Sequence, residues 1–111
     1  MKLPPVYTET YHFTIELMRR TAHLPKAYRP TLGRRMEEAA MDMTILLRQS
    51  LLTPSQRDYA GILSRVDTLK VCLQLAHELE ILSAHQSMTL SSLLDKIGKM
   101  LGGLQKQQKN T

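Results

Sequence analysis

The sequence predicts an all-α protein, an antiparallel up-down four-helix bundle formed by residues 1–111 as a single domain. Apolar residues recur at three- and four-residue spacing in four stretches, which is the pattern of one helix face. Prolines and polar residues separate these stretches by short connections, as in a bundle. The chain is 42% hydrophobic but has one phenylalanine and no tryptophan, whereas a β-sandwich would use more aromatic and β-branched residues.

The first helix is expected at about residues 6–24. It follows Pro4-Pro5 and ends at the two prolines of LPKAYRPT, residues 24–31. Its apolar residues form two lines, roughly 150° apart around the helix, instead of one stripe. One line contains Tyr11, Ile15, Met18 and Ala22, and the other contains Phe13, Leu17 and Leu24.

The second helix, at about 31–51, has one apolar stripe and needs one burial partner. The third is expected at about 54–82, because Thr53 can cap it, Pro54 suits its first position and Gln56 completes a capping box. Like the first helix, it has apolar residues on two sides. They are Ile62, Val66, Leu69 and Leu73 on one side, and Val71, Leu75 and Leu82 on the other.

The fourth helix is expected at about 84–105, after a second capping box at Ser83 and Gln86, with a basic tail at 106–111. Glycines interrupt its apolar stripe, and each costs about 1 kcal/mol relative to alanine in a helix. Gly98 and Gly102 lie four residues apart, so we expect another helix backbone to approach this side closely. The alternative is a helix that simply stops at Gly102-Gly103.

Apolar residues on two sides of the first and third helices predict self-association. A bundle core needs only one stripe, about 100° wide, on each helix. The additional apolar surface would be covered by further copies of the chain, so we expect a homo-oligomer.

The charge distribution favours an anionic partner. The formal net charge is +5, and two stretches carry basic residues without an acid, one between Glu16 and Glu37 and one after Asp95. Such stretches most often contact nucleic acid, although a solvated surface would have the same composition. A single cysteine, the absence of an apolar leader after MKLPP and the lack of any apolar run of about 18 residues predict a cytoplasmic protein.

No catalytic or metal-binding constellation is predicted. Glu9-x-x-His12 has the spacing of a di-iron ligand pair, but the sequence has no second copy, since His77-x-x-Glu80 is reversed. Cys72 lies among apolar residues with no base placed to activate it. The sequence also lacks a phosphate-binding loop, a dinucleotide fingerprint and a serine nucleophile elbow. We therefore expect a non-enzymatic protein without metal or cofactor.

Three segments resemble the accessory variability determinant (Avd) proteins of diversity-generating retroelements, a four-helix family related to ribosomal-RNA intervening-sequence proteins. They are LPKAYRPTLGRRMEEAAMDM, LKVCLQLAHELEILSAHQ and LLDKIGKMLGGL, in the family's order. The resemblance implies a barrel-like homopentamer with a basic surface that binds the retroelement's reverse transcriptase and template RNA. Such proteins support mutagenic complementary-DNA synthesis and are not enzymes themselves.

The resemblance also implies nucleic-acid-binding residues on the third helix, here Arg65 and Lys70. This chain has Gln74 and His77 where relatives often place basic residues, so its third helix is less basic. Compensation is expected from Arg34, Arg35, Lys96 and Lys99. The alternative function is a stand-alone bundle of the intervening-sequence group acting as a structural or interaction module. A neighbouring reverse-transcriptase gene with an adenine-variant repeat pair would favour the retroelement.

Overall fold

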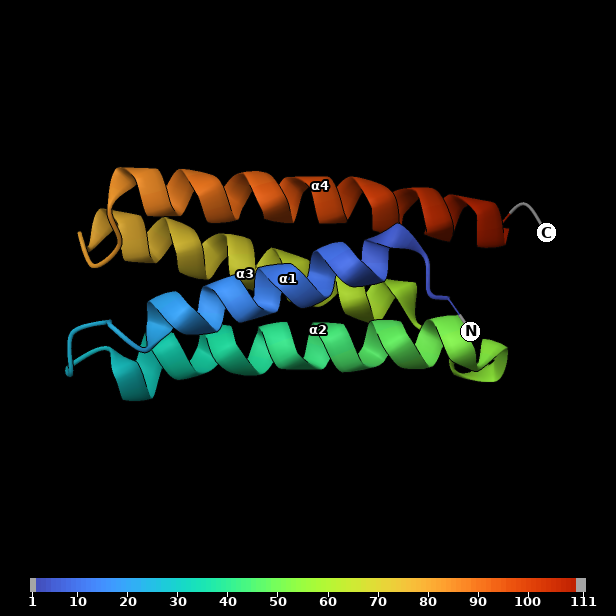
Figure 1. The fold of residues 1–111 in the computed structure, drawn as a ribbon, viewed down its shortest axis with the longest axis horizontal. Coiled ribbons are helices and arrows are strands. Elements are labelled where there is room, and N and C mark those ends of the chain that lie inside the picture. Colours follow the sequence, from blue (N-terminus) through green and yellow to red (C-terminus); the bar gives the residue numbers. More distant parts are fainter. Residues whose placement is uncertain (1, 110–111) are drawn as a thin grey trace.

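Four α-helices make up most of residues 2–109, the part of the chain that the computed structural model describes (Figure 1). They are α1 (Pro5–Thr21), α2 (Arg34–Leu52), α3 (Tyr59–Glu78) and α4 (Ala84–Lys109). A π-helical turn, η1 (Arg29–Gly33), precedes α2, and a 3-10 turn, η2 (Pro54–Gln56), precedes α3. Within this range there is no strand, which confirms the all-α prediction.

The helices lie side by side along a body of 46 × 21 × 20 Å. Figure 1 places the α1–α2 and α3–α4 connections at one end of the molecule and the α2–α3 connection at the other. Each helix packs against two others, in the cyclic order α1, α2, α3, α4. The bundle therefore has four outer faces, each named here by its two helices.

Aliphatic side chains and methionines from all four helices form the core, together with Phe13. Fully buried examples are Leu17 on α1, Met43 on α2, Leu69 on α3 and Leu94 on α4. Burying a side chain of this size contributes about 1.5–3 kcal/mol. Each helix thus buries one stripe, as the periodicity requires.

Threonine hydroxyls fix the contact between α1 and α2. Thr14 Oγ1 donates to Thr10 O of its own helix at 3.0 Å and lies 2.8 Å from Thr44 Oγ1 on α2. Two turns further along α1, Thr21 Oγ1 donates to the Glu37 carboxylate. These bonds place the two helices in a defined register.

Gly33 lets η1 pack closely against Leu24, which lies near the start of the α1–α2 connection. Its N–H donates to Tyr28 O at 2.9 Å, which closes the π turn. A Cβ at this position would lie 3.2 Å from Leu24 Cδ1 and 3.4 Å from Tyr28 O. Leu24 is buried and has little room to move away, so a glycine without a side chain suits this close contact.

The third helix starts later than predicted. Thr53 and Gln56 do not form the expected capping box: Thr53 has no side-chain cap bond, and Pro54–Gln56 is a 3-10 turn. Arg57 is extended and ends that turn, and Asp58 then caps α3 by accepting from Gly61 N at 2.9 Å. Asp58 N in turn donates to the buried Ser50 Oγ at 3.0 Å. Asp58, the residue that caps α3, is thus also hydrogen-bonded to α2.

The third helix also ends earlier, at Glu78, because a Schellman motif stops it. Ile81 N donates to Ala76 O and Glu80 N to His77 O, both at 3.0 Å. Glu80 takes the left-handed conformation, with φ of 58°. Because this residue is not glycine, the sequence did not reveal the stop.

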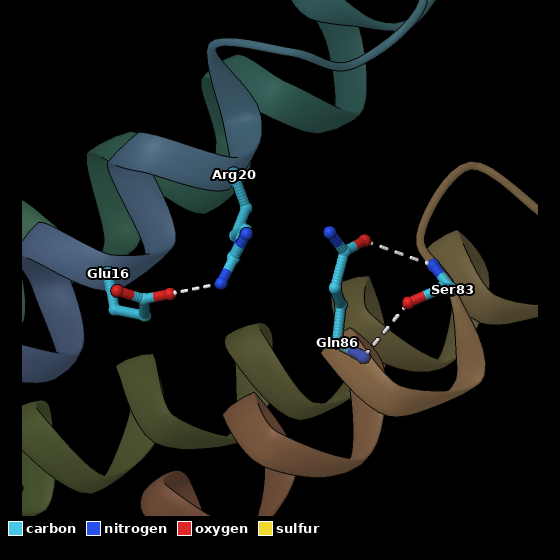
Figure 2. Close-up of polar contacts among 4 residues, drawn as sticks. All are labelled: Glu16, Arg20, Ser83 and Gln86. Carbon is cyan, nitrogen blue, oxygen red and sulfur yellow. Dashed lines mark hydrogen bonds and ion pairs between the residues drawn. The ribbon is translucent and has the colours of Figure 1, made fainter.

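The capping box at the start of α4 is confirmed. Figure 2 shows the reciprocal pair: Gln86 N donates to Ser83 Oγ and Ser83 N donates to Gln86 Oε1, both at 3.1 Å. At the other end, α4 continues to Lys109, so residues 106–109 are helical and not a tail. Residues 110–111 lie outside the described range.

The predicted close approach at Gly98 and Gly102 is wrong for contacts within one chain. A Cβ at Gly98 would make an ordinary contact, 3.7 Å from Val66 Cγ1, and at Gly102 or Gly103 it would meet nothing within 4 Å. The alternative is wrong as well, because the helix passes through all three glycines.

We expect Gly102→Ala to raise the free energy of unfolding by about 0.5–1 kcal/mol, because it removes a helix-interior glycine in open space. Gly33→Ala should gain less or lose stability, because the new methyl group must displace buried Leu24. Urea titrations of the two variants measure the difference. Equal gains would contradict the close packing described at Gly33.

We expect Glu80→Gly to stabilise the fold by about 0.5–1 kcal/mol, because glycine adopts the left-handed conformation without a steric penalty. Glu78→Gly is the matched control. It lies in the last turn of α3 and should lose about 1 kcal/mol. Thermal unfolding followed by circular dichroism checks both, and a loss at Glu80→Gly would contradict the Schellman stop.

Candidate nucleic-acid interface

The four outer faces differ in chemistry, and two of them carry clusters of exposed apolar residues. On the α1–α2 face, Tyr11 and Met18 flank Thr14, while Met41 lies three residues before Thr44. All three, and Ile45 beside Thr44, are large hydrophobic residues that remain exposed. Exposed apolar surface of this kind commonly marks an interaction site.

The α2–α3 face is hollowed into a groove of about 1020 Å³ that is mostly apolar but is also lined by Arg34, Arg35 and Asp67. Tyr28 and residues of η1, among them Leu32, form one wall. Val71 and Leu75 of α3 and Leu79, which follows α3, form the other and are 57%, 48% and 45% exposed. Val71 and Leu75 belong to the second apolar side that the sequence indicated, and the monomer leaves that side uncovered.

The other two faces carry ion pairs. Lys96 Nζ of α4 lies 3.0 Å from Glu9 Oε1 of α1, and Lys70 Nζ of α3 lies 3.7 Å from Asp95 Oδ1 of α4. A third pair, Glu16 with Arg20, runs along α1 at 2.7 Å (Figure 2). Their side chains are partly exposed, so each pair contributes about 0–1 kcal/mol and can exchange its partner for a phosphate.

The structure does not bring Arg65 and Lys70 together, although the sequence predicts both as binding residues on one helix. Arg65 faces α2, lines a small cavity with Arg35 and donates to Gly61 O at 3.2 Å. Lys70 faces α4 and pairs with Asp95. Because the two lie on opposite sides of α3, they cannot form one compact site.

Carboxylates accompany the arginines near the start of α2. Arg34 Nε donates to Glu38 Oε1 at 2.9 Å. Arg35 and Arg65 line a cavity of about 200 Å³ together with Glu38 and Asp42. The positive charge of these three predicted residues is therefore partly balanced, which weakens their attraction for phosphate.

Lysines on α4 form a second exposed basic surface. Lys96 and Lys99 lie on its outer side but reach different neighbours, since Lys96 pairs with Glu9 on α1 and Lys99 lines a hollow shared with α3. In residues 2–109, Lys99 has no ion pair. Helical continuation to Lys109 places Lys106 two turns beyond Lys99 on the same side. We call Lys96, Lys99 and Lys106 the lysine stripe.

The sequence reasoning missed Lys106 because it placed that residue in a tail. The signal was present, since lysines suit the last turn of a helix, where they complement the dipole. The stripe spans ten residues, or about 15 Å along the helix axis. No acidic residue follows Asp95 in α4 to balance it.

In residues 2–109, the structure offers no constellation for catalysis by a metal or a thiolate. No group of three or more histidine, cysteine, aspartate or glutamate side chains is placed to hold a metal ion. Burial raises the pKa of the Cys72 thiol, and the Arg35 charge opposes this only in part. The thiol therefore stays protonated near neutral pH. No helix in this range is both long and apolar enough to cross a bilayer.

Comparison of the chain with protein-family models, curated proteins and solved structures gave no match. The case for a function therefore depends on the chain's own motifs and surfaces.

Proposed function

We propose that this protein is a non-enzymatic accessory subunit of a diversity-generating retroelement. It binds the retroelement's reverse transcriptase and template RNA and supports mutagenic complementary-DNA synthesis. The three Avd-like sequence segments favour this assignment over other helical bundles. The observation that carries the RNA-binding part is the lysine stripe of α4, which lies beyond the last acidic residue of the chain.

The lysine stripe suits a phosphate backbone. Its ammonium groups are flexible point charges, and RNA binding releases the counterions condensed on each phosphate they contact. One subunit offers few such contacts, but symmetry repeats each of them around an oligomer, so modest sites combine into useful avidity. The reverse transcriptase is the second proposed partner and would compete for the same charged faces if its contact is electrostatic.

Self-association of antiparallel bundles into a barrel-like homopentamer is the second part of the proposal. Its support is that the two faces with exposed apolar residues differ and both border α2. When the α1–α2 face of one copy meets the α2–α3 groove of the next, the contact is head-to-tail, and such contacts form a closed ring when the rotation between copies closes. Adjacent faces of a four-helix body point roughly 90° apart, which suits a ring of about four or five subunits. The two charged faces then remain outside.

We expect an oligomer mass by light scattering at micromolar concentration. Val71→Asp, which places a charge in the exposed wall of the groove, should lower that mass and leave the helical signal unchanged. Thr89→Asp is a control at an exposed position of α4 outside the groove. A monomer mass for the parent protein would contradict self-association.

We expect RNA binding that weakens linearly in log–log terms as salt rises, with a slope of about −0.7 for each phosphate contacted on a single strand. Lys99→Glu with Lys106→Glu should lower both the affinity and the slope. Arg65→Glu should have a smaller effect, because it reverses one charge instead of two and the partly buried Arg65 already donates to Gly61 O. Fluorescence anisotropy with labelled template RNA measures these changes.

Arg19→Glu with Lys26→Glu is the charge-matched control for the lysine-stripe variant, since both positions are exposed and lie outside α4. Equal losses in the two double variants would indicate attraction by net charge and not by the stripe. Copurification with a cognate reverse transcriptase and template RNA tests the whole proposal. Failure of both to copurify, without salt-sensitive RNA binding, would favour the stand-alone module.

A further inference from the structure

A hollow of about 270 Å³ lies between α3 and α4, beside the lysine stripe. Its lining residues are Leu63, Val66, Asp67 and Lys70 from α3, and Asp95, Gly98 and Lys99 from α4. Gly98 helps to open this space, because its absent Cβ would lie 3.7 Å from Val66 Cγ1 and any longer side chain would extend into the hollow. This accounts for a glycine that no helix packs against closely.

The lining combines three kinds of group. Leu63 and the buried Val66 provide apolar surface. Asp67 and Asp95 provide carboxylate acceptors, and Lys70 and Lys99 provide ammonium donors. Of these four charged residues, only Lys70 and Asp95 form an ion pair within residues 2–109, with 3.7 Å between Nζ and Oδ1. Both side chains are about half exposed, so this pair can separate at little cost in free energy.

The mixture restricts the class of ligand. Two carboxylates disfavour a purely anionic ligand, two ammonium groups disfavour a cation, and four charged groups disfavour a purely apolar ligand. A nucleotide in a single strand matches all three kinds of group. Its base has apolar faces and hydrogen-bonding edges, and the phosphates on both sides are anionic.

We propose that the α3–α4 hollow holds one unstacked base of single-stranded RNA, with the flanking phosphates on Lys70 and Lys99. The base contacts Leu63, and an exocyclic amino group donates to Asp67. Carboxylates accept from such amino groups, so bases that carry one are preferred over uracil. This inference rests on the proposed RNA binding and adds a base-recognition site to it.

The test fills the hollow without changing a charge. Gly98→Leu places a side chain in it, and Gly103→Leu is the matched control on the same helix, where a Cβ meets nothing within 4 Å. The probes are labelled oligoadenylate, oligouridylate and an abasic oligomer of equal length. Circular dichroism and light scattering establish that both variants keep the fold and mass of the parent.

Gly98→Leu should weaken oligoadenylate binding about fivefold or more. Stacking of one base on an aromatic side chain contributes at least that much to affinity, and contact with the aliphatic lining of this hollow should contribute an amount near the lower limit of that range. Its affinity for the abasic oligomer and its salt slope should stay unchanged, because every lysine remains. Asp67→Asn, at an exposed position, should reduce the preference for oligoadenylate over oligouridylate. This variant keeps the test decisive if Gly98→Leu does not fold.

Equal oligoadenylate affinities for the Gly98→Leu and Gly103→Leu variants would overturn the base site while leaving RNA binding intact. So would an unchanged base preference in Asp67→Asn. Absence of salt-sensitive binding of any oligomer by the parent protein would instead overturn the proposed function, and the base site with it. The two failures are therefore distinguishable.

Discussion

Burial of one apolar stripe from each helix around a shared core is the constraint on which the other features depend. Once Phe13, Met43, Leu69 and Leu94 are inside, the remaining side chains are distributed over four outer faces. Most of the exposed large hydrophobic residues then lie on the α1–α2 and α2–α3 faces, although Met88 lies on α4, and the cross-helix ion pairs lie on the other two faces. The division into apolar and charged sides is thus a consequence of the core.

The periodicity of apolar residues predicted the helices well, because a buried stripe leaves a regular record in the sequence. The ends of α3 could not be predicted in the same way. Asp58 replaced Thr53 as the cap because the preceding turn is 3-10, and Glu80 stops the helix in a conformation that usually signals itself through glycine. The ends of a helix depend on a few local hydrogen bonds, and several nearby residues could have formed those bonds.

The candidate site was harder to predict than the fold. The sequence shows which residues are basic, but it does not show which carboxylates lie beside them. Arg35 and Arg65 share a cavity with Glu38 and Asp42, and Lys99 lines a hollow with Asp67 and Asp95. The sequence predicts that Arg65 and Lys70 lie on one helix. Only the packing of α3 between α2 and α4 shows that they face different neighbours.

The position of α2 has a consequence for how this chain can vary. This helix borders both faces with exposed apolar residues, so its outward-facing residues lie beside apolar surface on either side, and few of them contact solvent alone. The outer side of α4, by contrast, consists largely of small, polar and basic residues that contact little within the chain. Sequence drift should therefore be slow along α2 and faster along α4, apart from the α4 positions that are proposed to contact RNA.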